Sequence, residues 1–114
     1  MTTQKTLITA EQLLAMPTGM GERYELIAGE LITMPPSGGQ HGVSSVAVAH
    51  AIKSFVLANR IPGMVFGAET GFFLQHNPDT VRAPDAAFVR DGRFPDGRIP
   101  AGYIDGAPEL VVEV

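Results

Sequence analysis

The order of apolar and polar positions divides the chain into a helix–hairpin–helix part and a strand-rich part. Thr9 and Gln12 form a capping box, which predicts a short helix over about residues 10–16. β-rich residues fill positions 23–27 and 30–34, and the two positions between them include a glycine. This spacing predicts a β-hairpin.

The longest helical pattern covers residues 41–59. Apolar residues recur there in two stripes at helical spacing, so we expect both sides of this helix to be buried, one of them against a sheet. Its most apolar window, residues 43–57, is interrupted by His50, Lys53 and Ser54. The interruption argues against a membrane span, and His50 is expected to lie in the core.

The rest of the chain reads as strands separated by turns and one long loop. Strand-like stretches cover residues 64–69, 70–75, 81–89 and 109–114. Pro84 lies within the third stretch and must sit at a strand start or a bulge, because it has no N–H to donate. Residues 91–106 are rich in Gly and Pro and are expected to form a loop. This order predicts an α+β fold, in one domain over residues 1–114.

Composition narrows the range of functions. The chain carries a net charge of −4, which argues against tight non-specific binding to nucleic acid. A cluster of arginines is nevertheless available for phosphate contacts: Arg82, Arg90, Arg93 and Arg98. The absence of cysteine excludes disulfides, thiolate zinc sites and cysteine nucleophiles, and it fits a cytoplasmic location.

Two acids lie inside apolar strand-like stretches. Asp85 shares a strand face with Ala87 and Val89, and Glu113 shares one with Val111. A carboxylate in such a run is unfavourable unless it is paired, hydrogen-bonded or bound to metal. Magnesium is often held by only one or two carboxylates, with waters and phosphate oxygens completing its shell. Alternatively, the first acid caps a local turn and the second is simply exposed.

Other acids have weaker patterns. Glu69 ends a strand that should neighbour the strand of Asp85, so it is a candidate third carboxylate ligand, or else an exposed strand-end acid. Glu25 and Glu30 belong to the predicted hairpin, where solvent exposure or a salt bridge is expected.

Five pieces of the chain, taken in order, match a known pattern. They are residues 24–31 (YELIAGEL), His41 at a helix start, residues 81–89 (VRAPDAAFV), residues 100–103 (PAGY) and residues 107–114 (APELVVEV). In this arrangement the chain resembles the Uma-two family of endonucleases, a branch of the PD-(D/E)xK restriction-endonuclease-like superfamily.

The resemblance implies a restriction-endonuclease-like core, in which a mixed sheet is combined with an N-terminal helix, a β-hairpin and one long packing helix. The family's Pro-Asp motif falls on Pro84 and Asp85, and its second acid on Glu113. These two carboxylates would hold Mg²⁺ or Mn²⁺, which activates water for hydrolysis of DNA phosphodiesters. His41 matches the family's helix-opening histidine and would approach the metal or the phosphate, or make a hydrogen bond at the helix start.

One part of the superfamily pattern has no counterpart here. A catalytic lysine follows the second acid in the superfamily, and no lysine of this sequence occupies that position. The domain is therefore expected to be incomplete at its C-terminus, with a terminal strand whose open edge could form a homodimer. Three hypotheses remain: a metal-dependent endonuclease, a non-catalytic remnant that binds metal or protein, and an unrelated α+β binding domain whose acids are structural.

Overall fold

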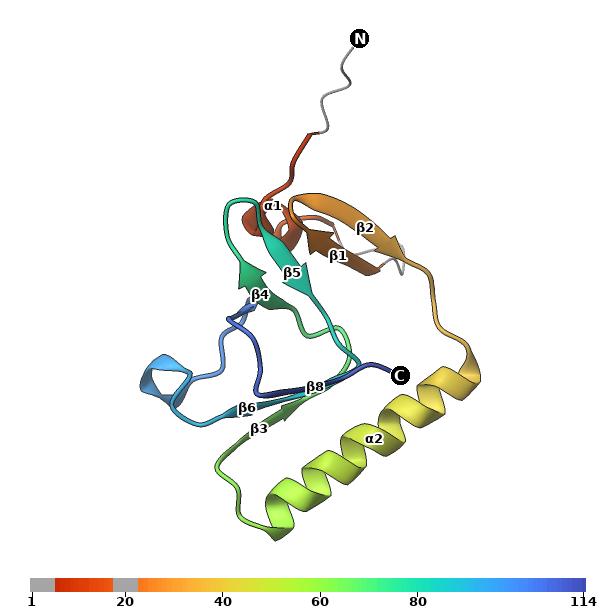
Figure 1. The fold of residues 1–114 in the computed structure, drawn as a ribbon, viewed down its shortest axis with the longest axis vertical. Helices are drawn as coiled ribbons and strands as arrows, with labels where there is room; N and C mark the ends of the chain where they lie inside the picture. Colours follow the sequence, from red (N-terminus) through yellow and green to blue (C-terminus); the bar gives the residue numbers. More distant parts are fainter. Residues whose placement is uncertain (1–5, 18–22) are drawn as a thin grey trace.

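The computed structural model describes residues 6–17 and 23–114 of the chain (Figure 1). Along the chain the elements are α1 (Ala10–Leu14), β1 (Arg23–Ile27), β2 (Glu30–Met34), α2 (Gly39–Ala58), β3 (Gly63–Phe66), β4 (Phe72–Gln75), β5 (Thr80–Arg82), β6 (Ala86–Arg90), the 3₁₀ turn η1 (Pro95–Gly97), β7 (Ile104–Asp105) and β8 (Leu110–Val112). The fold is α+β, as the sequence predicts.

The N-terminal elements form as expected. The hydroxyl of Thr9 accepts from the N–H of Gln12 at 3.1 Å, and the Gln12 side chain accepts from the N–H of Thr9 at 2.9 Å. This confirms the capping box, although α1 already ends at Leu14. Strands β1 and β2 pair antiparallel across a two-residue turn. Ala28 and Gly29 both have positive φ there, which the tight hairpin turn requires.

The strands form two sheets. The larger has the order β2-β1-β5-β4-β7 and is mixed, because β7 runs parallel to β4 while the other pairs are antiparallel. The smaller has the order β3-β6-β8 and is antiparallel. One buried cluster, around Leu26 and Val81, lies on the larger sheet, and a second joins the two sheets, with Phe72 of β4 packed with Val89 of β6.

Two sequence predictions about residues 81–106 are wrong. Residues 81–89 are not one strand: β5 ends at Arg82, β6 begins at Ala86, and the two belong to different sheets. Pro84 lies at the change of sheet, where its missing N–H removes no ladder hydrogen bond. The stretch 91–106, predicted as an open loop, contains η1 and the short strand β7.

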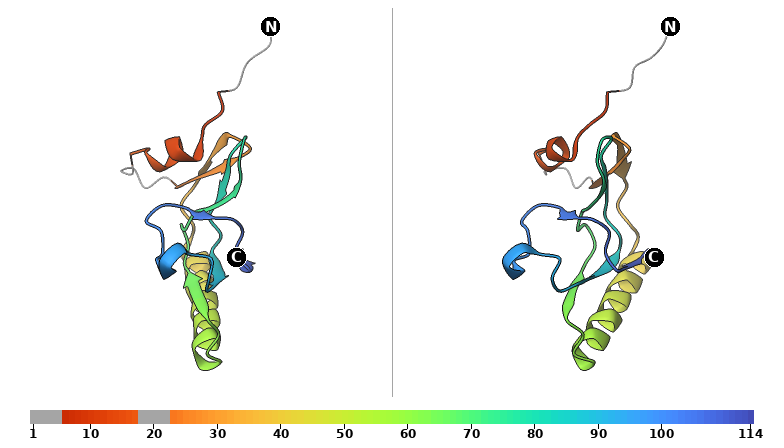
Figure 2. Two further views of the ribbon diagram at one scale, coloured as in Figure 1. Left: turned by 90° about the vertical axis from the view of Figure 1, so that its left-hand side faces the viewer. Right: turned by 60° about the vertical axis from the view of Figure 1, so that its left-hand side comes forward.

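Helix α2 packs on the smaller sheet through β3 and β6, at the end of the molecule away from α1 (Figures 1 and 2). The prediction that both of its sides are buried is wrong: Val56 is its buried residue, whereas Val43 and Phe55 are 73% and 62% exposed. His50, predicted in the core, is exposed. Among the described residues, α2 is the one helix long and apolar enough to cross a membrane, by length and composition alone.

Candidate functional site

The two acids predicted from the sequence meet where β8 runs beside the start of β6. Ala86 lies opposite Val112, and the pairing continues because the N–H of Asp85 donates to the carbonyl of Val112 at 3.1 Å. In return, the N–H of Val114 donates to Asp85 Oδ2 at 2.7 Å. Glu113 is therefore held between two residues that bind Asp85, which brings its side chain next to the Asp85 carboxylate.

Asp85 is buried and ionised. Its side chain is 8% exposed. The pKa of Asp85 lies below its ordinary value, mainly because the Val114 N–H donates to the carboxylate. Burial acts in the opposite direction, while the hydrogen bond and charge of His41 and the charge of Arg23 lower the pKa further.

Glu113 is exposed, as the alternative drawn from the sequence has it, and its pKa shifts in the opposite direction to that of Asp85. Partial burial raises the pKa of Glu113 above its ordinary value, and the negative charges of Asp85 and Glu25 raise it further. The charge of Arg82 opposes this rise, and a hydrogen bond between the side chains of Glu113 and Asp85 also favours the protonated form. The two carboxyl groups thus lie close enough to act on each other. This proximity contradicts the hypothesis of two unrelated structural acids, which expects them far apart.

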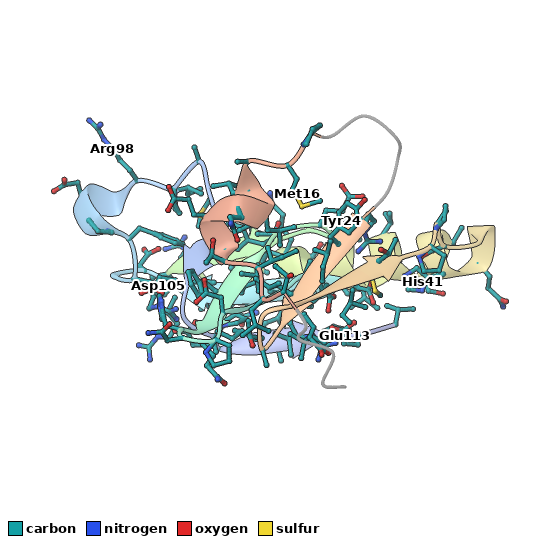
Figure 3. All side chains as sticks on the ribbon, turned by 90° about the horizontal axis from the view of Figure 1, so that it is seen from above. Met16, Tyr24, His41, Arg98, Asp105 and Glu113 are labelled. Carbon is teal, nitrogen blue, oxygen red and sulfur yellow. The ribbon has the colours of Figure 1, made fainter. Side chains whose placement is uncertain are left out.

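His41 contacts Asp85 from the first turn of α2, and Figure 3 labels it on this helix. Its Nε2 lies 3.1 Å from Asp85 Oδ1, and its side chain is 31% exposed. Because the Asp85 carboxylate is ionised and can only accept, the Nε2 atom must carry the hydrogen. The histidine therefore contacts the predicted metal ligand while its side chain remains partly exposed.

Glu69 is not part of this group. Its carboxylate is 68% exposed and lies 3.7 Å from the guanidinium of Arg23. Within residues 6–17 and 23–114, no three or more His, Asp or Glu side chains are grouped so that they could hold a metal ion together. The arrangement gives no support to Glu69 as a third ligand.

Glu25 is a candidate for the site that the sequence patterns do not single out. They predict solvent exposure or a salt bridge, but Glu25 is only 6% exposed. Arg82 Nε donates to its Oε2 at 2.9 Å, so the salt-bridge alternative is correct and the exposure is wrong. The signal was present: Glu25 lies in an apolar strand, the same pattern that singled out Asp85 and Glu113.

The arginine cluster is dispersed by the fold. Arg82 is bound to Glu25, and Arg93 donates to the carbonyl oxygens of Asp105 and Ala107. Arg98 lies at the opposite end of the molecule from His41 (Figure 3). Of this cluster, Arg82 acts electrostatically on Glu113, and Arg23, from outside the cluster, acts on Asp85.

The donor set at the acid pair fits a hard divalent cation. Two carboxylates in contact repel each other when both are ionised, and a cation between them removes that repulsion. Both oxygens of Asp85 accept one hydrogen bond each and retain a further lone pair. A two-carboxylate set of this kind suits Mg²⁺ or Mn²⁺ held partly by water and phosphate, rather than a closed protein cage.

The fold is a mixed α+β core with one long helix, and it matches that of a solved nuclease neighbour. The sequence profile of the Uma2 family, described as "Putative restriction endonuclease", matches residues 10–114. The chain belongs to the Uma2 family. This confirms the resemblance drawn from the sequence motifs.

A solved structure agrees with this assignment. The chain is similar to a crystal structure described as a "putative nuclease belonging to DUF820" from Anabaena variabilis, with a TM-score of 0.70 and 26% sequence identity. The match covers 93% of this chain and 57% of that one, so the chain spans a little over half of the neighbour's length. No match is found among curated proteins.

Proposed function

We propose that this chain carries the metal-binding part of a Mg²⁺- or Mn²⁺-dependent DNA endonuclease that hydrolyses phosphodiesters. The observation that carries the proposal is the convergence of the Asp85 and Glu113 carboxyl groups beside His41. Membership of the Uma2 family and the fold of the nuclease neighbour support the reaction class.

Each residue of the site has a distinct task. Asp85, ionised and fixed by Val114 and His41, offers a constant negative ligand. Glu113, whose pKa is raised by burial and by neighbouring acids, would supply the second carboxylate ligand in its deprotonated form. His41 holds Asp85 through Nε2 and presents its exposed edge toward an incoming phosphate. A bound divalent ion would supply a more acidic water and positive charge for the phosphoryl oxygens.

Positive charge next to the acids supports a phosphate substrate. Arg23 lowers the pKa of Asp85 and Arg82 opposes the rise in the pKa of Glu113, so both cations lie within electrostatic reach of the site. With a net charge of −4 on the chain, attraction to DNA depends on such local cations and on the metal. DNA binding should therefore be weak without a divalent ion.

Incubation of supercoiled plasmid with Mn²⁺ and the purified chain tests cleavage, with calorimetric Mn²⁺ binding measured in parallel. The wild-type chain is expected to bind Mn²⁺ and nick the plasmid, and Asp85→Ala and Glu113→Ala should do neither. If both variants still nick the plasmid, the cleavage does not depend on the Asp85–Glu113 site.

A second candidate is a non-catalytic module that binds metal or protein. The homodimer expected from the sequence pairs through the open edge of the terminal strand, and self-association through α2 is a different form of this candidate. Exposed apolar side chains on α2, among them Val43, Val46, Phe55 and Leu57, favour it. Sedimentation velocity over a range of concentrations tests this candidate. Mn²⁺ binding without nicking, together with a dimer that Phe55→Glu dissociates, would favour it over the enzyme.

A further inference from the structure

Glu25 and Asp85 are the two buried charged side chains within the part of the chain that the structure describes. They come from different elements: Glu25 lies in β1 of the larger sheet, and Asp85 lies just before β6 of the smaller one. Burying a carboxylate is unfavourable unless hydrogen bonds replace its lost water. The partners of Glu25 therefore indicate what this carboxylate does.

Both oxygens of Glu25 bind the segment that leads to Asp85. Arg82 Nε donates to Oε2 at 2.9 Å, and the N–H of Ala83 approaches Oε1 at 3.4 Å. Arg82 and Ala83 directly precede Pro84, which has no N–H of its own. Where β5 ends, the Glu25 carboxylate thus accepts hydrogen bonds from the segment that continues toward β6.

The far end of the same segment is fixed by β8. Asp85 donates through its N–H to Val112 and accepts from the N–H of Val114. The corner from Arg82 to Asp85 is consequently tied at one end to β1 and at the other to β8. Arg82 also lines one pocket together with Glu113, Pro84 and Val111, so the Glu25–Arg82 ion pair lies beside the acid pair.

Resting on the proposed function, we propose that Glu25 is a positioning residue for the metal site, which fixes the Arg82–Ala83 segment so that Asp85 faces Glu113. We assign it no ligand role, because the guanidinium of Arg82 already compensates its charge, whereas the donors to Asp85 are an imidazole and a backbone amide. Groups that orient metal ligands typically change metal affinity by 10–100-fold when removed. The expected loss for Glu25 is therefore about tenfold in Mn²⁺ affinity.

The test measures the Mn²⁺ dissociation constant by calorimetry for wild type, Glu25→Ala, Glu25→Gln and Arg82→Met. Circular dichroism at the same temperature verifies that each variant is folded. Glu25→Gln is included because it keeps the size and one acceptor oxygen, so it folds even if Glu25→Ala does not. Glu30→Ala, an exposed acid of the same hairpin, is the matched control for loss of charge.

A positioning role predicts weaker Mn²⁺ binding in folded Glu25→Ala, Glu25→Gln and Arg82→Met, and an unchanged constant in Glu30→Ala. The double variant Glu25→Gln/Arg82→Met should bind no more weakly than the weaker of the two single variants, because both remove the same link. A purely structural role instead lowers the melting temperature and leaves the constant of the folded protein unchanged.

Asp85→Ala separates the two proposals. If wild type binds Mn²⁺, Asp85→Ala does not, and folded Glu25→Gln binds as wild type does, the positioning role is overturned and the metal site stands. If wild type itself binds no Mn²⁺, the proposed function fails and the role of Glu25 in a metal site fails with it.

Discussion

Two histidine–aspartate contacts in this protein join the same kinds of atoms at nearly the same distance but lie in different surroundings. His41 Nε2 and Asp85 Oδ1 are 3.1 Å apart, with side chains 31% and 8% exposed. His76 Nε2 and Asp105 Oδ1 are 3.3 Å apart, with side chains 66% and 84% exposed. Water can replace the partners of the second pair but not those of the first. A contact becomes part of a site here through burial and through the second acid beside it.

Replacing each aspartate by alanine should give the largest difference between the two pairs, in Mn²⁺ affinity and in the free energy of unfolding. Asp85→Ala should weaken Mn²⁺ binding at least about 100-fold, since it removes a ligand and not only a group that orients one. It should also lower the free energy of unfolding by about 2–4 kcal/mol, because the Val114 N–H loses a charged acceptor in a part-buried position. Calorimetry and urea unfolding measure the two effects.

Asp105→Ala is the matched control for this change. It removes the same side chain from an exposed contact, so both the metal affinity and the unfolding free energy should change little, the latter by at most about 0.5 kcal/mol. Equal effects of the two substitutions would show that the burial of Asp85 has no bearing on metal binding.

The next effect concerns pH and depends on Glu113, which the exposed pair lacks. The pKa of Glu113 is raised above its ordinary value of 4.5, so its contribution to metal-free stability is full below pH 4.5 and is lost as pH rises through the raised value. The pKa of Asp85 is lowered from its ordinary value of 3.8, so its contribution is present above pH 3.8 and is lost as pH falls through the lowered value. The metal-free protein should therefore be most stable between the lowered pKa of Asp85 and the raised pKa of Glu113, and its melting temperature should fall at lower and at higher pH.

As pH rises through the raised pKa of Glu113, Mn²⁺ affinity should increase while the stability of the metal-free protein decreases. Because the ion displaces the proton of Glu113, affinity should fall by up to about tenfold per pH unit below the raised pKa of Glu113. Melting curves and titrations between pH 4 and 8 follow both trends. Glu113→Gln should abolish the decline of metal-free stability above pH 4.5, and a decline that persists would assign it to another group.

Local signals in the sequence were sufficient for two elements of the fold and for the proposal of the acid pair. The capping box of Thr9 and Gln12 and the two-residue turn at Gly29 depend on neighbours within a few positions, so they could be predicted. Asp85 and Glu113 were found because each interrupts an apolar stretch, and a buried carboxylate needs a partner whatever the fold.

The parts that the sequence did not predict depend on contacts between distant segments. Periodicity alone suggested that α2 is covered on both sides, but it cannot tell which apolar face meets another element. The burial of Glu25 depends on its contacts with Arg82 and Ala83, more than fifty positions away in the chain. The division at Pro84 follows from the pairing of β5 and β6 with different sheets.

A smaller effect separates the two histidines. His41→Ala leaves Asp85 ionised through its bond to Val114, so metal binding should persist but weaken by about tenfold, as expected for loss of a group that orients a ligand. His76→Ala, which removes an exposed ring stacked on Phe73, should leave the Mn²⁺ constant unchanged. The two variants are compared by calorimetry at one pH, and equal constants would contradict a role for His41.

The smallest expected effect is the coupling within the exposed pair itself. A double-mutant cycle over His76→Ala and Asp105→Ala should give a coupling energy of about 0–1 kcal/mol, and added salt should reduce it, because water and ions screen two exposed charges. The same cycle over His41→Ala and Asp85→Ala should give a larger coupling that salt reduces less, since Asp85 is shielded from solvent. Urea unfolding at low and high ionic strength measures both cycles. If the two couplings are equal and respond equally to salt, burial does not distinguish the contacts, and the reason for placing His41 rather than His76 in the site is lost.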